Sequence, residues 1–229
     1  AWYSALRAGT PAVRALLAAD ATGPNVAEAV TVLERARQEA LSRLGPRQEV
    51  LARALAAAPL DKPVSIGVVF KGEVREAPLR APPGYTLAPL SVEVSDAGRA
   101  ARQRGAVAFL QRELDAVVGA GWFVVREGAG DLSLTVSYVL SPTGKAFVLK
   151  TQSQTVPLVW PDVVLEGEAK WSGAVRAFRL GPDASLRLHD RVVTAAVRQN
   201  DSVRVASTLF DETWRRLHAE LAAVLGLEG

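Results

Sequence analysis

The side chains that could take part in catalysis are few in this chain of 229 residues, and they lie far apart in the sequence. The absence of cysteine excludes a thiolate nucleophile, a structural disulfide and a cysteine-ligated metal centre. The two histidines are His189, which precedes Asp190, and His218, and we expect both at the surface. A serine hydrolase would need a serine on a sharp turn beside a histidine, yet no G-x-S-x-G segment is present, and Ser172 in Trp-Ser-Gly lacks the first glycine. We therefore expect no catalytic residue of the nucleophilic type.

Carboxylates offer a second kind of chemistry, either general acid–base catalysis or metal binding. Glu166 and Glu168 are two residues apart, so on a strand they share a face, and Asp162 could join them. With only two histidines, both remote in the sequence, the pattern predicts a solvated strand face, no metal site and no cofactor. The enzymatic alternative is a hydrolase whose site combines five residues, namely Asp131, Glu166, Glu168, His189 and Asp190.

Residues 128–131, Gly-Ala-Gly-Asp, resemble half of a phosphate-binding loop. A strand pattern follows them, whereas a phosphate-binding loop is followed by a helix whose N-terminus helps to hold the anion. The segment therefore predicts a hairpin or another interstrand turn.

Arginines of one amphipathic segment, residues 97–118, form the main candidate binding surface. Arg99 and Arg102 share a helical face, and Arg104 lies roughly a quarter turn or more away. Guanidinium groups pair well with phosphate, so a phosphorylated or lipid-A-like partner would suit this cluster, and the alternative is an ordinary solvated helix surface. The net charge of +3 is too small to indicate nucleic acid as a partner.

A second candidate for binding is Trp160, which stands between Val159 and Pro161 at an expected strand corner. A tryptophan beside proline at such a corner serves either as an exposed contact or as a plug that fills the loop. We therefore add Trp160 to the three arginines as an expected binding residue.

Helical patterns dominate the N-terminal part of the chain. Residues 2–19 read as a helix broken near its middle by Gly-Thr-Pro. A longer amphipathic helix follows over 26–44, and a Gly-Pro pair ends it and begins another. We expect residues 1–59 to form a helical annex and residues 60–229 to form an α+β sheet domain.

Alternation of apolar and polar residues dominates the rest of the chain. The clearest example is 131–140, whose leucine, valine and tyrosine side chains fall at every second position, so one sheet face should be apolar and the other wet. Short turns join neighbouring strands, which favours an antiparallel meander. Strands are expected over 63–70, 90–94, 122–125, 131–140, 145–155, 163–180 and 186–197.

Two amphipathic helices accompany these strands. Residues 97–118 place Leu110 and Leu114 on one face and end at a glycine, and residues 202–225 carry a similar apolar stripe. The predicted fold is therefore α+β: an antiparallel sheet covered on one face by these two helices, with an N-terminal helical annex.

The stretch from about 90 to 226 resembles small envelope-accessory domains of Gram-negative bacteria. In 110–140 an amphipathic helix ends in Gly-Ala-Gly-Trp-Phe-Val-Val, and Asp-Leu-Ser-Leu-Thr-Val-Ser-Tyr opens the next strand. The lipopolysaccharide-assembly plug lipoprotein has this order of elements, and the lipoprotein activators of penicillin-binding proteins and the N-terminal domain of the Tol-system propeller protein are similar in part. This chain departs from them in its helical N-terminus and in lacking a lipidation cysteine at its first residue. The resemblance implies an α+β fold and carries over no site residue.

The expected compartment follows from what the chain lacks. It contains no methionine and begins at Ala1, so we expect it to be processed from a longer precursor or trimmed. No run approaches the ~20 apolar residues that span a bilayer. The expected location is the periplasm or another exported site, and a removed N-terminal anchor is an equal alternative.

These observations predict a non-catalytic accessory protein of the envelope, similar to lipoproteins of outer-membrane assembly, that binds another envelope protein or an anionic glycolipid. One alternative is a structural subunit of a larger assembly that oligomerises through residues 1–59. The other is the hydrolase with a carboxylate and histidine site.

Overall fold

The computed structural model describes residues 2–19, 22–74, 96–142, 146–150, 155–159, 162–175, 178–179, 185–193, 197–198 and 202–227. The helices are α1 (Trp2–Ala8), α2 (Thr10–Ala19), α3 (Val26–Ser42), the short 3-10 helix η1 (Pro46–Gln48), α4 (Glu49–Ala57), α5 (Asp96–Val118) and α6 (Ser202–Leu225). The strands are β1 (Val64–Val74), β2 (Phe123–Glu127), β3 (Leu132–Pro142), β4 (Ala146–Lys150), β5 (Thr155–Val159), β6 (Asp162–Val175), β7 (Phe178–Arg179), β8 (Ser185–Val193) and β9 (Val197–Arg198). The α+β class is confirmed, and the strand predicted over 90–94 lies outside the described residues.

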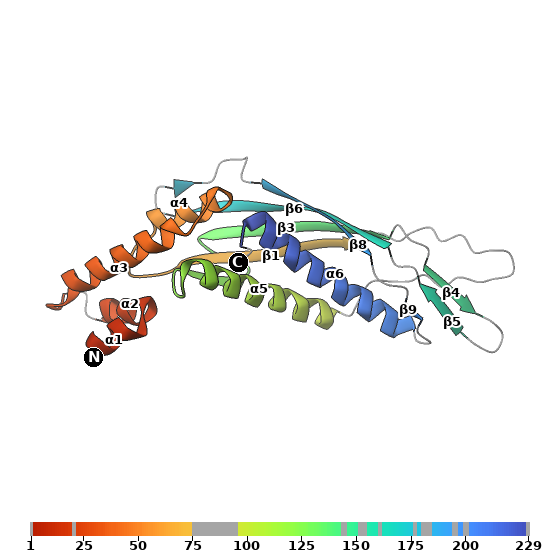
Figure 1. Cartoon of the computed structure of the whole chain (residues 1–229), viewed down its shortest axis with the longest axis horizontal. Coiled ribbons are helices and arrows are strands. Elements are labelled where there is room, and N and C mark those ends of the chain that lie inside the picture. The colour runs from red at the N-terminus through yellow and green to blue at the C-terminus, as the bar shows by residue number, and fades with distance from the viewer. Residues whose placement is uncertain are drawn as a thin grey trace.

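The elements form an elongated molecule with a six-stranded sheet at its middle (Figure 1). Helices α1, α2 and α3 lie toward one end, and strands β4, β5 and β9 make a small second sheet toward the other end. Helices α5 and α6 lie side by side along one side of the main sheet.

The main sheet is mixed, which corrects the expectation of an antiparallel sheet. Strand β1 lies between β2 and β3 and runs parallel to both, so that Ile66 stands beside Val125 on one side and Leu132 on the other. Strand β6 pairs antiparallel with β3, and both β7 and β8 pair antiparallel with β6.

The parallel pairing comes from the connection between β2 and β3. Residues 128–131 do not form the predicted hairpin but cross over β1, which places β3 on its far side. The crossing requires a glycine beneath it, because a Cβ atom on Gly67 would lie 2.6 Å from the carbonyl carbon of Ala129 and 2.7 Å from the nitrogen of Gly130. The segment does connect two strands, as predicted, but the hairpin form of the prediction was wrong. A short loop between two strands ordinarily indicates a hairpin, and the crossing depends on Gly67, which belongs to a distant segment of the sequence.

The hydrophobic core lies between the main sheet and the two long helices. Ile66 and Leu134 of the sheet pack in one cluster with Leu114 of α5 and with Leu217 and Leu221 of α6. Apolar residues recur at every second position in the strands and at every third or fourth position in the helices, so each element buries one face. The prediction that two amphipathic helices cover one face of the sheet is confirmed.

The N-terminal helices contribute to two clusters of buried side chains. Leu51 and Leu55 of α4 belong to the main core, whereas Val13 and Leu33 form a small cluster of their own. The division of the chain after residue 59 stays a prediction.

Arg14 fastens helix α2 to the rest of the molecule. Its buried guanidinium donates hydrogen bonds to the carbonyl oxygen of Leu60, 2.8 Å from Nε, and to that of Gly121. Its Cζ atom lies 4.4 Å from the centre of the Trp122 ring, within the range of a cation–π contact. Burial lowers the pKa of Arg14 to about 10, against the opposing effect of Asp61, so the guanidinium stays charged at neutral pH.

Gln111 of α5 closes the outer edge of strand β2. Its side-chain amide donates to the carbonyl oxygen of Phe123 at 3.2 Å and accepts from the N–H of Val125 at 2.7 Å, as a neighbouring strand would. Asp115 accepts a second hydrogen bond from the same amide nitrogen at 3.0 Å and so fixes its orientation. Free strand edges invite pairing with other chains, and this edge is therefore protected between Phe123 and Val125.

Candidate functional site

The face of the main sheet that is turned away from α5 and α6 carries mostly short polar and charged side chains. They alternate with the buried residues along β1, β3 and β6 and are half-buried or exposed, as expected for the wet face of a sheet. We call this surface the open face, and its members are Val69, Lys71, Ser133, Thr135, Ser137, Val139, Glu168, Lys170 and Ser172.

The strand register arranges the open face in rows across the sheet. Thr135 stands opposite Lys170 in one row, and Lys71, Ser137 and Glu168 follow one another in the next row. Neighbouring strands are ~4.8 Å apart, and side chains on one face of a strand recur every ~7 Å. The hydroxyl groups of Thr135 and Ser137 therefore occupy the strand between the two lysines.

Asp131 lies at one end of this face, where the crossing segment enters β3. Its Oδ2 atom accepts hydrogen bonds from the backbone N–H of Ser65 at 2.9 Å and from the Ser65 hydroxyl at 2.7 Å, and its own N–H donates to that hydroxyl at 2.9 Å. The hydrogen bond from the Ser65 N–H is the main reason that the pKa of Asp131 lies below its ordinary value, and Lys62 also lowers it. Asp131 is therefore an ionised carboxylate that ties the crossing to β1.

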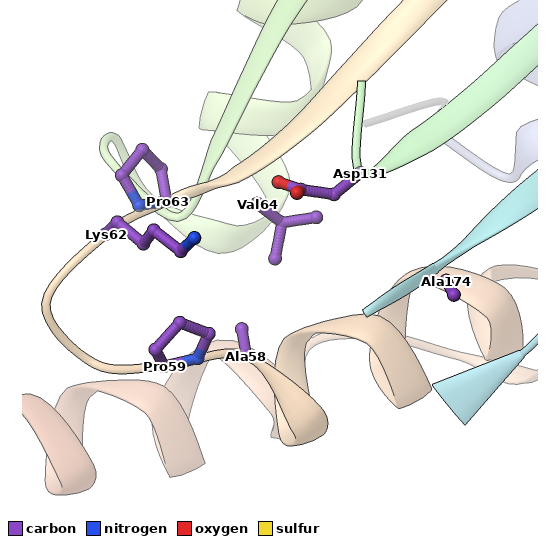
Figure 2. Close-up of a pocket in the computed structure, with 7 residues that line it drawn as sticks. All are labelled: Ala58, Pro59, Lys62, Pro63, Val64, Asp131 and Ala174. Atoms are coloured by element: carbon purple, nitrogen blue, oxygen red, sulfur yellow. The ribbon is translucent and has the colours of Figure 1, made fainter. Parts of the chain in front are cut away.

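A small cavity opens beside Asp131 (Figure 2). Its lining comes from the connection between α4 and β1 and from strand ends, namely Ala58, Pro59, Lys62, Pro63, Val64, Asp131 and Ala174. Figure 2 shows the Lys62 amine and the Asp131 carboxylate pointing toward the same space. No ion pair joins these two side chains in the part of the chain that the structure describes.

The cavity is too small to enclose a substrate. Its volume is about 90 Å³, whereas pockets for small-molecule ligands hold roughly 300–1,000 Å³. It can accommodate a few water molecules. Because Asp131 is already engaged by Ser65, the open face is better suited than this cavity to binding a partner.

The arginines expected to bind a partner differ in their availability. Arg99 and Arg102 are half-buried, and each already takes part in an interaction within the chain, whereas Arg104 is exposed. Burial raises the pKa of Tyr138, and Arg99 lies close enough to oppose that rise. Trp160 lies outside the described residues, and binding by these four side chains stays a prediction.

The strand register brings Glu166, Glu168 and His189 of the alternative hydrolase site to neighbouring positions, and it separates Asp131 and Asp190 from them. Glu166 and His189 are partners in the register of β6 and β8, but Asp190 takes the alternate position of its strand. Glu168 pairs with β3 at residue 137, six residues beyond Asp131 and thus roughly 20 Å away along the strand. The strand register therefore provides no site that is common to all five residues.

Metal binding and membrane crossing have no candidate within the described ranges. No group of three or more histidine, cysteine, aspartate and glutamate residues is placed there to hold a metal ion. No helix in the same ranges combines the length and the apolar character that crossing a membrane requires.

His218 is half-buried between α6 and α5, whereas a surface position was expected. Its ring stacks on Phe109, with 5.2 Å between centroids and 15° between planes, and it meets Trp214 edge-on at 6.1 Å. Its Nε2 atom is buried and has no hydrogen-bond partner among the described residues. Burial therefore lowers the pKa of His218 below its ordinary value of 6.5.

We expect the folded chain to lose stability in mild acid because of His218. Above the unfolded-state pKa of 6.5 the imidazole is neutral in both states and does not affect the free energy of unfolding. Below it the unfolded chain binds the proton more readily, because burial lowers the pKa in the folded state. The free energy of unfolding therefore declines as the pH falls from 6.5 through the folded-state pKa. Urea unfolding between about pH 7.5 and about pH 5 should show a smaller decline in His218→Phe, which retains an aromatic ring but cannot titrate. Equal declines in the two proteins would contradict this assignment.

The sequence did not single out Lys71, Thr135, Ser137 and Lys170 as a group. Each occupies an ordinary polar position in an alternating strand, so the alternation places each of them on the wet face. Only the register of β1, β3 and β6 brings the four positions together.

No protein-family model matches this chain, and no curated protein matches it. A solved structure of a neuraminyllactose-binding hemagglutinin homolog from Helicobacter pylori is similar at 9% identity and a TM-score of 0.37, over 73% of this chain and 84% of that one. A protein of the DUF330 family from Xanthomonas campestris is similar at 14% identity and a TM-score of 0.34, over 72% of this chain and 88% of that one. Both come from Gram-negative bacteria, and scores at this level carry no argument about function.

Proposed function

We propose that this chain is a non-catalytic accessory protein of a bacterial envelope that binds another envelope component, a protein or an anionic glycolipid, through the open face. The observation that carries this proposal is the difference between the two faces of the main sheet. Helices α5 and α6 bury one face, while the other presents accessible polar side chains such as Thr135 and Lys170. Such a broad surface suits binding of a partner better than enclosure of a substrate.

Because Gln111 already occupies the edge of strand β2, the open face is the better candidate for the binding surface. The Gln111 amide already occupies the backbone groups of Phe123 and Val125 that an added strand would need. Docking of a partner strand at β2 would first have to displace this side chain.

The two alternatives have less support. The hydrolase would need Asp131 and Glu168 in one site, and the register separates them. Oligomerisation through residues 1–59 could not use Leu51 or Val13, because both are packed inside the chain.

The proposal includes an exported or periplasmic location, with an N-terminal tether as a variant of it. Its support is the sequence resemblance of the stretch from about 90 to 226 to envelope-accessory domains. Fractionation of cells of the native host tests the location separately from binding, and recovery of the chain in the cytoplasm alone would count against it.

Photocrosslinking in the native host tests binding through the open face. A photoreactive phenylalanine analogue at Thr135 should give an adduct with an envelope component, which mass spectrometry identifies. The same analogue at Ala116, which is exposed on α5, serves as the matched control and should give little adduct. Equal yields at the two positions, or adducts with cytoplasmic proteins alone, would refute the proposal.

A further inference from the structure

Two lysines of the open face have no partner in the described part of the chain. Lys71 and Lys170 are exposed, and neither takes part in a hydrogen bond or an ion pair there. Glu168 of the same face already takes part in an interaction within the chain, and the register gives Glu73 and Glu166 positions on this face beside Val139. The ammonium groups of Lys71 and Lys170 are therefore available to a ligand, on a face that carries acidic positions as well.

These lysines stand on either side of two hydroxyl groups. Lys71 on β1 lies beside Ser137 on β3, and Lys170 on β6 lies opposite Thr135 on β3. Their Cα atoms are thus ~10 Å apart across the sheet and ~7 Å apart along it. Lysine side chains are long and flexible, so the two ammonium groups can approach one ligand from opposite sides while the hydroxyl groups contact its middle.

The open face offers few apolar anchors for a protein partner. Protein interfaces depend on large side chains near their centre, above all tryptophan, tyrosine and arginine. The valines of the open face, Val69 and Val139, are half-buried, and the large hydrophobic side chain exposed in the described residues is Val124 on β2, at 42%. Ammonium and hydroxyl groups instead match the oxygens of phosphate groups and sugars.

We propose that the open face binds the phosphorylated headgroup of a glycolipid, in which Lys71 and Lys170 pair with two phosphate groups and Thr135 and Ser137 donate hydrogen bonds to sugar oxygens between them. The inference rests on the proposed function, because it names the chemistry of the partner on the same face. A headgroup with a phosphate at each end of a sugar scaffold fits the separation of the lysines. A headgroup with one phosphate leaves one ammonium group unpaired.

Vesicle binding tests this inference. Phosphatidylcholine vesicles that contain lipid A, a glycolipid with two phosphates, are compared with vesicles brought to the same negative charge with phosphatidylglycerol. We expect tighter binding to the lipid A vesicles. Each substitution, Lys71→Glu or Lys170→Glu, should weaken that binding on the order of tenfold, and the double substitution on the order of a hundredfold, because each removes a charge-assisted contact.

Two further variants separate the site from general effects of charge and folding. The pair Arg7→Glu and Arg35→Glu reverses two charges at exposed positions of α1 and α3 and should bind as the native chain does. The pair Thr135→Val and Ser137→Ala removes the hydroxyl groups without a change of charge and should weaken binding several-fold. Thermal unfolding followed by circular dichroism verifies that every variant is folded.

The outcomes separate this inference from the proposed function. Equal binding to both kinds of vesicle, or equal losses in the open-face and control variants, overturns the inference. A loss that follows reversal of Arg99, Arg102 and Arg104, with the lysine variants unaffected, overturns it in favour of α5. A protein adduct at Thr135 without lipid A binding overturns the inference and leaves the proposed function standing. If the chain gives no adduct at Thr135 and also does not bind lipid A, both the inference and the proposed function are overturned.

Discussion

Replacement of Gly67 by alanine should destabilise the folded chain by about 3 kcal/mol. The new methyl group would lie 2.6 Å from the carbonyl carbon of Ala129 and 2.7 Å from the nitrogen of Gly130, where the crossing segment passes over β1. These neighbours are backbone atoms that cannot rotate away, so either β1 or the crossing must shift within a packed structure. Urea unfolding with an unchanged m-value measures the loss as a lower midpoint.

Gly105→Ala is the matched control for this substitution. Gly105 lies within α5, and a Cβ atom there would have nothing within 4 Å. Alanine is the better helix former by about 1 kcal/mol, so this variant should be more stable than the native chain. If the free energy of unfolding falls in Gly67→Ala and rises in Gly105→Ala, the loss is due to the crossing. A rise in Gly67→Ala would show that the crossing segment and β1 are not in close contact.

A shift of the crossing segment in Gly67→Ala should also change the structure at one end of the open face. The path of residues 128–131 places Asp131 beside Ser65, and the three hydrogen bonds between these two residues depend on that path. A shift of the segment would therefore release the Asp131 carboxylate as well as the backbone. The stability of the fold and the shape of the candidate site are coupled through Gly67.

Arg14→Ala should have the second-largest effect, a loss of about 2–3 kcal/mol. The substitution leaves the carbonyl oxygens of Leu60 and Gly121 without their donor, at a cost of about 1–3 kcal/mol for each buried group. It also removes the contact with the Trp122 ring. Relief of the desolvation that lowers the Arg14 pKa offsets part of these losses, so the net effect is smaller than their sum.

Arg7→Ala provides the comparison, since Arg7 is exposed on the neighbouring helix α1 and its loss should change stability by no more than about 0.5 kcal/mol. Arg14→Lys retains the charge but lacks the planar fork that reaches two acceptors, so we expect an intermediate loss. Urea unfolding of all three variants measures the differences. If Arg14→Ala and Arg7→Ala were equally stable, Arg14 could not be the group that fastens α2.

The sequence by itself determined the elements and their buried faces. The periodicity of 97–118 predicts α5 almost to its ends, including the burial of Leu110 and Leu114. The alternation in 131–140 predicts β3 and separates its buried leucines from its hydroxyl-bearing positions. Both signals are local, because the period of a helix or a strand is the spacing of apolar residues within one short segment.

The tertiary structure alone decided how these elements are joined and what they place together. Whether residues 128–131 turn back or cross β1 depends on Gly67, a residue that no local pattern connects to them. The same holds for the open face, where Lys71 and Lys170 come to flank β3 through the pairing of three strands. Register and chain crossing depend on contacts between segments distant in sequence, so the two-lysine surface exists only in the folded chain.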